Sequence, residues 1–243
     1  MKILISSIII IAVLADALLL AQPVKVTDNA EITNKVGVIR FGYFPNINHA
    51  IPIVGLARNS FKDAFPDIEI KASIFNAGPS AIEALFADQI DLAYIGPNPA
   101  INGYIKSNGA LKIIAGAASG GAVFVVRNDS DLLAEADFAG MTFASPQLGN
   151  TQDVALRTFI LNNGYRFVEQ GGNVRVIPVQ NPDIFVLFLK KEIDGAWVPE
   201  PWGARLVREA NGRIFLDERQ LWPNGKFVTA QLIVRTKFLE EHP

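Results

Sequence analysis

The chain of 243 residues contains no cysteine and only two histidines, His49 and His242. The absence of cysteine excludes a disulfide framework, a thiolate metal site, a cysteine nucleophile and the lipid-modified cysteine that anchors many exported proteins. With only two histidines, far apart in the sequence, a histidine-rich metal site is not expected. We therefore predict neither a metal nor a cofactor.

Charged residues are also scarce, at 19% of the chain, with a formal net charge of −2 and an isoelectric point near 5.7. No basic cluster is present, so nucleic acid is not an expected partner. Half of the residues are hydrophobic. This length and composition allow one large domain or two modest α/β lobes, each with its own core.

The N-terminus is typical of an export signal. Met1-Lys2 precedes an apolar run from Ile3 to Leu14 and then Ala15-Asp16-Ala17, a small-x-small cleavage candidate. Alternatively, the run continues to Ala21 as an uncleaved anchor, where a central Asp16 costs up to about 3 kcal/mol. Residues 1–21 are thus a signal peptide or anchor and 22–35 a polar linker. Either interpretation predicts an exported protein, periplasmic or at the cell surface.

A strand–loop–helix unit occurs twice. Ile90-Asp91-Leu92-Ala93-Tyr94-Ile95 and Ile193-Asp194-Gly195-Ala196-Trp197-Val198 share the pattern Ile-Asp-x-Ala-aromatic-aliphatic, and the second begins 103 residues after the first. A proline-opened helix follows each copy, and a short apolar helix precedes each. Two copies of one unit predict two similarly built lobes.

Two extended apolar runs, Gly121 to Arg127 and Lys226 to Val234, fit crossings between these lobes. The predicted division is 36–124 plus 229–243 for the first lobe and 125–228 for the second. Strands alternating with helices predict parallel sheets, and ligands bind at the carboxyl ends of such strands. We therefore expect an α/β fold of two lobes that close on a ligand by hinge bending.

The loop from Ser145 to Thr151 leads from a buried strand into a helix that ends near Gly164. Asn150 or Thr151 can cap this helix, and Gly149 lets the backbone come close to a ligand. The free N–H groups of a helix start favour an anion. Alternatively, this loop is an ordinary connection between a strand and a well-capped helix, with no role in binding.

Other loops at strand ends have the same character, since Asn76 to Ser80 and Gly96 to Asn98 both open proline-started helices. No lysine or arginine lies in these loops, so we expect backbone N–H groups and neutral side chains to hold an anion. His49, in the first turn of another helix, can donate to it; Trp197 can pack an organic tail, and Glu200 can accept from an amino group. The predicted ligand-binding residues are His49, Asn76, Gly78, Ser80, Gly96, Pro97, Asn98, Gln147, Gly149, Asn150, Thr151, Trp197 and Glu200.

These loops contain no Ser–His–Asp set, phosphate loop or zinc pattern, so no enzyme activity is predicted. Four blocks of sequence resemble the solute-binding proteins of nitrate, sulfonate and taurine ABC importers: Asn76 to Ser80, Tyr94 to Ala100, Pro146 to Arg157 and Trp197 to Trp202. The resemblance runs from about Val36 to Pro243. It implies a type II periplasmic-binding-protein fold, no catalysis, and a membrane permease and ATPase as partners. Such proteins normally continue with helices that complete the first lobe, so a C-terminally truncated chain is expected.

For the ligand, an alkylsulfonate or taurine is expected first, nitrate next and a stacked pyrimidine third. Two other functions share this fold. One is a thiamine-pyrimidine-precursor binding protein or the histidine-consuming pyrimidine synthase, and the absent cysteines and the export signal count against the synthase. The other is the effector-binding domain of a transcription regulator, which would need a helix-turn-helix where this chain has an apolar segment.

Overall fold

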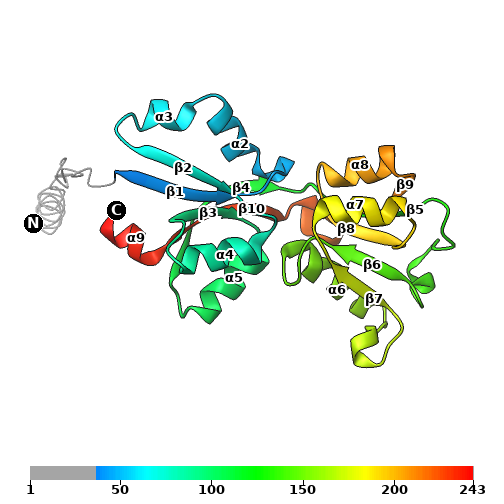
Figure 1. The fold of residues 1–243 in the computed structure, drawn as a ribbon. Helices are drawn as coiled ribbons and strands as arrows, with labels where there is room; N and C mark the ends of the chain where they lie inside the picture. Colours follow the sequence, from blue (N-terminus) through cyan, green and yellow to red (C-terminus); the bar gives the residue numbers. More distant parts are fainter. Residues whose placement is uncertain (1–36, 243) are drawn as a thin grey trace, which may run out of the picture. The chain divides into compact units, whose positions relative to one another are not determined.

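The computed structural model describes residues 37–242. The predicted signal segment and linker lie outside these residues. Within the described part, none of the helices has both the length and the hydropathy that crossing a membrane requires. The described chain forms two five-stranded sheets, each with helices on both faces (Figure 1).

The first sheet has the strand order β2-β1-β3-β10-β4. Strand β1 is parallel to β2 and β3, whereas β10 runs antiparallel to β3 and β4. Helices α2 and α3 lie on one face, and α4 and α5 on the other (Figure 1). The elements of this lobe are β1 (Val38–Tyr43), η1 (Ile47–His49), α2 (Ala50–Ala57), α3 (Ser60–Ala64), β2 (Glu69–Ile74), α4 (Gly78–Phe86), β3 (Leu92–Ile95), α5 (Pro97–Lys106), β4 (Leu111–Ser119), β10 (Val228–Arg235) and α9 (Thr236–Glu241).

The second sheet has the corresponding order β7-β6-β8-β5-β9, with β6 parallel to β7 and β8, and β5 antiparallel to β8 and β9. Its elements are β5 (Ala122–Arg127), η2 (Glu135–Asp137), β6 (Thr142–Ser145), α6 (Thr151–Asn162), η3 (Val168–Gln170), β7 (Arg175–Pro178), α7 (Asn181–Leu189), β8 (Gly195–Pro199), α8 (Trp202–Glu209), β9 (Gly212–Asp217), η4 (Glu218–Leu221) and η5 (Pro223–Gly225). Tyr94 and Trp197, the aromatic residues of the two repeat copies, lie in different sheets, so the predicted α/β fold of two lobes is confirmed.

The aspartates of the repeat explain why the pattern occurs twice. The Oδ2 of Asp91 accepts from the backbone N–H of Arg40 at 2.9 Å, and the Oδ2 of Asp194 accepts from the N–H of Thr142 at 2.8 Å. Each aspartate N–H in turn donates to the carbonyl of the same partner at 2.7 Å. Each aspartate therefore fixes the register between two parallel strands just before the central one begins.

An arginine at the end of the antiparallel strand completes each arrangement. Arg235 donates to Asp91 through Nη2 at 2.7 Å, and Arg127 reaches Asp194 at 3.5 Å. Burial alone would raise the pKa of Asp91, but hydrogen bonds from Arg40 and Arg235 outweigh burial and hold that pKa below its usual value. Asp91 thus joins three strands of its sheet as a buried carboxylate.

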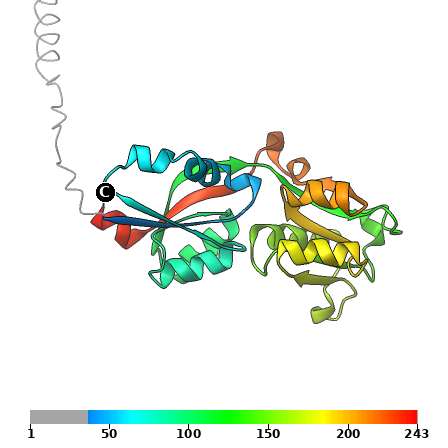
Figure 2. The ribbon, with the colours of Figure 1, turned by 45° about the horizontal axis from the view of Figure 1, so that its top comes forward.

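The chain changes sheets between Ser119 and Ala122, and returns to the first sheet at Val228. The two crossing segments run beside each other (Figure 2), and are joined where Gly120 N–H donates to the Phe227 carbonyl at 3.1 Å and Thr229 Oγ1 donates to the Gly120 carbonyl at 2.7 Å. Residues 122–124, assigned to the first lobe in the predicted division, pair with the second sheet here. The predicted division into 36–124 plus 229–243 and 125–228 remains a prediction in its exact boundaries.

The buried cores follow the lobes. One cluster around Leu85, Ile95 and Ile233 fills the first lobe. Two clusters, around Phe124 and around Val198, lie on opposite faces of the second sheet. Because each sheet has its own core, each lobe can hold its shape while the crossings bend.

We predict that Asp91→Asn destabilises the protein by about 2–3 kcal/mol, because the buried acceptor that Arg40 and Arg235 share loses its charge. Asp194→Asn is the matched control, and should cost only about 1 kcal/mol since its arginine contact is longer and its side chain is 23% exposed. Urea unfolding at pH 7 measures both. Equal losses in the two variants would contradict the assigned role of Asp91.

Candidate ligand-binding site

The start of α6 is held by its own loop. Asn150 caps the helix, its Oδ1 accepting from the Asp153 N–H at 2.7 Å. The Asp153 carboxylate accepts from Ser145 Oγ at 2.6 Å and from Gly149 N–H at 2.9 Å. Gly149 has φ of 76°, so it serves the turn that joins strand and helix. These bonds present Asn150 and Thr151 at the end of the strand.

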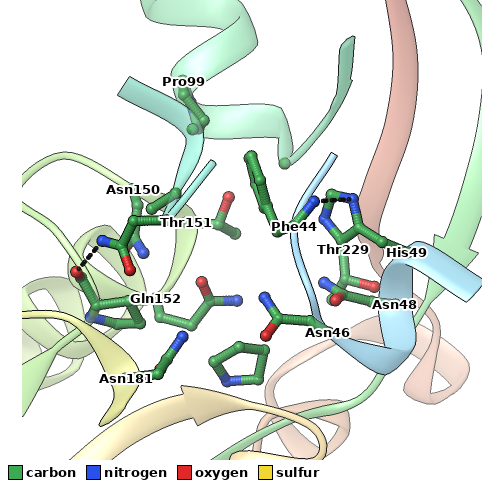
Figure 3. A pocket seen from close by; sticks show the side chains of 16 residues that line it. Phe44, Asn46, Asn48, His49, Pro99, Asn150, Thr151, Gln152, Asn181 and Thr229 are labelled. Atoms are coloured by element: carbon green, nitrogen blue, oxygen red, sulfur yellow. Dashed lines mark hydrogen bonds between the residues drawn. The ribbon is translucent and has the colours of Figure 1, made fainter. Parts of the chain in front are cut away.

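A small cavity lies where this helix start meets the strand ends of the first lobe (Figure 3). Both lobes and the second crossing contribute to its lining. The residues are Phe44, Asn46, Asn48, His49, Asn76, Ala77, Gly78, Gly96, Pro99, Pro146, Asn150, Thr151, Gln152, Asn181, Pro199 and Thr229. None of these sixteen side chains is acidic, lysine or arginine, so the cavity is polar but carries no fixed charge.

Four polar atoms of the lining are buried and have no hydrogen-bond partner among the described residues: Asn48 Oδ1, His49 Nε2, Thr151 Oγ1 and Asn181 Oδ1. An unsatisfied buried polar atom costs about 1–3 kcal/mol, and native proteins contain few of them. Their concentration at one cavity indicates that a small polar ligand or water completes their hydrogen bonds.

The imidazole of His49 has a defined role in this set. Its Nδ1 accepts from the Phe44 N–H at 3.3 Å, which places the hydrogen of the neutral ring on Nε2. The ring is 1% exposed, and burial lowers its pKa to about 3. His49 therefore offers an unpartnered N–H donor to the cavity without a positive charge.

Four helices begin at the cavity. Gly78 opens α4, Gly96 precedes α5, Thr151 opens α6 and Asn181 opens α7. The free N–H groups and the dipole at each start favour a negative charge, by roughly 0.3–2 kcal/mol per helix. Their convergence provides an anion-binding environment in which no side-chain cation is needed.

The lobes touch each other around this cavity. Ile47 N–H donates to the Glu200 carbonyl at 2.9 Å, Trp202 Nε1 donates to Asn46 Oδ1 at 3.2 Å, and Asn76 Nδ2 donates to the Pro146 carbonyl at 3.2 Å. The enclosed space is about 20 Å³, which suits one water-sized group. A larger ligand enters only when the lobes separate.

Six of the thirteen predicted residues line the cavity: His49, Asn76, Gly78, Gly96, Asn150 and Thr151. The other seven do not: Ser80, Pro97, Asn98, Gln147, Gly149, Trp197 and Glu200. The Ser80 hydroxyl donates back to the Ala77 carbonyl, and Pro97 and Asn98 face a separate groove beside α5.

Trp197 and Glu200 need correction. The expected tail-packing residue Trp197 is fully buried and stacks on Phe124, with ring centroids 5.5 Å apart. The expected amino acceptor Glu200 uses Oε2 to accept from the Ala204 N–H at 2.9 Å, in the first turn of the helix that follows it, α8. Neither side chain reaches the cavity.

Sequence reasoning missed other lining residues. Asn46 and Asn48 precede His49 in the same loop and are not among the predicted residues. Asn181 lies 103 residues after Gly78, so the spacing of the repeat could have found it. Nothing in the sequence pointed to Thr229, which reaches the cavity only because the second crossing returns beside the first.

The model of the NMT1-like family matches residues 33–243. The chain belongs to the NMT1-like family. A candidate binding protein of Brucella abortus (strain 2308) is 25% identical to this NMT1-like chain over 177 residues, which are 72% of the chain and 52% of the relative. The chain thus spans about half the length of the curated relatives it matches.

Solved structures similar to this NMT1-like protein include two anion-binding proteins. The alkanesulfonate-binding protein SsuA from Xanthomonas axonopodis pv. citri, bound to MOPS, has a TM-score of 0.71 at 18% identity, over 84% of this chain and 68% of that one. The periplasmic nitrate-binding protein NrtA from Synechocystis PCC 6803 has a TM-score of 0.69 at 17% identity, over 86% and 58%. These likenesses confirm the predicted type II periplasmic-binding-protein fold.

We predict that His49 stays neutral from pH 8 to pH 5, so its imidazole resonances should not titrate in that range. The unfolded chain binds a proton here below about pH 6.5, whereas the folded chain does not until about pH 3. Stability is therefore lost as the pH falls through this window, by about 3 kcal/mol at pH 4. His49→Gln should remove this component from the pH dependence of urea unfolding. A titration midpoint near 6.5 would show that the ring is not buried as described.

Proposed function

We propose that this protein is the solute-binding component of an ABC-type importer and captures a small oxyanion, a sulfonate or nitrate, in the cavity between its lobes. A membrane permease and an ATPase are its proposed partners, and an exported location follows from that role. One observation carries the proposal: two unpartnered buried donors, His49 Nε2 and Thr151 Oγ1, meet four helix starts in a cavity without a charged side chain.

The neutral lining fits a permanently ionised anion better than one that must lose a proton. Nitrate and sulfonate remain charged at every pH at which the protein folds, so a binding site needs only to replace their hydration. The N–H of His49 and the hydroxyl of Thr151 are donors for this purpose, as are the backbone groups at the helix starts. Such a site also releases its ligand readily, because no ion pair has to be broken for transfer to a permease.

The size and lining of the cavity favour a compact ligand. The features that supported taurine, a tryptophan for its chain and Glu200 for its amino group, are absent from the lining. Phe44 is the one aromatic carbocycle there, and it already packs on His49 at 4.3 Å between ring centroids. A pyrimidine stacked between aromatic rings therefore fits less well than nitrate or a short alkylsulfonate.

We predict that Thr151→Val weakens nitrate and methanesulfonate binding about ten- to a hundredfold, because one hydrogen bond to a charged ligand is lost. Isothermal titration calorimetry of the expressed chain measures this directly. Thr158→Val, the same substitution two turns along α6 at an exposed position, is the control and should leave affinity unchanged. Equal anion affinity in both variants would refute the proposed site.

The same titrations should show anion affinity that is constant between pH 6 and pH 8. His49 is the one titratable side chain in the lining, and its pKa of about 3 lies far below this range. Affinity that changed tenfold across these pH values would mean that an ionisable group outside the described lining holds the anion.

A further inference from the structure

A second, larger hollow lies on another side of the chain, between α5, α6 and the segment from η4 to β10. Its volume is about 660 Å³. It shares only Thr151 with the cavity described above. The lining residues are Pro97, Asn98, Ile101, Thr151, Val154, Ala155, Thr158, Phe159, Asn162, Glu218, Leu221, Trp222, Phe227 and Val228. Most of this surface is apolar, and Glu218 is its one ionisable group.

Glu218 is an unusual carboxyl in this protein. The described residues bury three acidic side chains, Asp91, Asp153 and Glu218. Asp91 contacts two arginines and Asp153 contacts Arg157 at 3.0 Å, whereas no basic side chain pairs with Glu218 among the described residues.

Indole groups surround this carboxyl instead. Trp197 Nε1 donates to Glu218 Oε2 at 2.8 Å, and Trp222 lines the same groove. Burial raises the pKa of Glu218 to about 7, the two indole groups oppose that rise, and the neighbouring Asp217 adds to it. The charge of Asp217 is itself paired with Arg219, at 2.5 Å. A buried carboxylate without a cation is costly, so Glu218 loses its proton only near neutral pH, and a cation in the hollow would stabilise the charged form.

The aromatic residues that line the groove also favour a particular kind of ligand. Trp222 and Phe227 stack with ring centroids 5.7 Å apart, and Phe159 lies on the opposite helix. Aromatic rings attract a cation over their faces and also accept an apolar body. No basic side chain lines the groove, so the only side-chain charge that the lining can develop is negative.

We propose that this groove is a second ligand site, which takes a primary organic ammonium whose head pairs with Glu218 and whose apolar body packs against Trp222 and Phe159. The ligand class is opposite in charge to that of the cavity, and the inference does not depend on the proposed function. Its lining comes from both lobes and from the second crossing, so an occupant contacts both lobes at once.

The test is a titration of the expressed chain with phenethylammonium chloride, followed by calorimetry and by tryptophan fluorescence. Phenethyl alcohol and phenylacetate are the neutral and anionic probes of similar shape. We expect the ammonium to bind at least tenfold more tightly than the alcohol, and phenylacetate not to bind. Binding should also strengthen from pH 6 to pH 8, as Glu218 loses its proton.

Two variants locate the site. Glu218→Gln keeps an acceptor for Trp197 and should weaken ammonium binding at least tenfold. Ile101→Lys, at a position on α5 that is 54% exposed, places a cation in the groove without touching the core and should abolish binding. Asn181→Ala, which alters only the anion cavity, should leave ammonium affinity unchanged.

The proposal is overturned if the ammonium does not bind at millimolar concentration, if the alcohol binds equally well, or if Glu218→Gln and Ile101→Lys both bind like the unmodified protein. These outcomes are distinct from failure of the anion site, since the Thr151→Val and nitrate titrations are read separately.

Discussion

The paired crossings determine where every functional group of this protein can lie. Gly120 is bonded both to the Phe227 carbonyl and to the Thr229 hydroxyl, so the two connections behave as one narrow joint. The crossings connect corresponding strands of the two sheets, β4 to β5 and β9 to β10. The parallel strands of each lobe therefore have their carboxyl ends on the side that faces the other lobe. The helix starts that follow these strands therefore meet across the cavity.

Burial without a counter-charge produces opposite results at the two hollows. At the cavity, burial keeps His49 neutral, and the partial charges of helix starts supply an attraction for anions. At the groove, burial opposes ionisation of Glu218, and among the described residues no basic side chain pairs with it. The same physical effect thus underlies both proposals, an anion at the cavity and a cation at the groove.

Much of the architecture was readable from the sequence because it repeats. Ile-Asp-x-Ala marks the central parallel strand of each sheet, and the glycine- and proline-opened helices after the strands predicted where the cavity would form. The function of the repeated aspartates was not readable, since it depends on strands that pair across more than 50 residues. The local sequence pattern therefore does not reveal Arg40 and Thr142 as the hydrogen-bond partners of these aspartates.

Trp197 and Glu200 miss the cavity for two different reasons. Every residue of β8, including Trp197, is buried, because this strand is covered on both faces and paired on both edges. Side chains in the middle of this strand therefore pack into the core, and only Pro199, at its end, lines the cavity. Glu200, just beyond the strand, accepts from the Ala204 N–H in the first turn of α8. Proximity to a strand end therefore does not guarantee that a side chain reaches the ligand.

Reversible capture requires that contact between the lobes be weak enough to break. Three hydrogen bonds are described across the cavity, and each contributes only about 1 kcal/mol net, since water replaces it on opening. Four unsatisfied polar atoms oppose the closed arrangement when nothing occupies the cavity. A ligand that accepts from two of them, His49 Nε2 and Thr151 Oγ1, shifts the balance toward closure by its differential affinity for the closed form. The incomplete hydrogen bonding of the cavity is therefore what makes closure depend on the ligand.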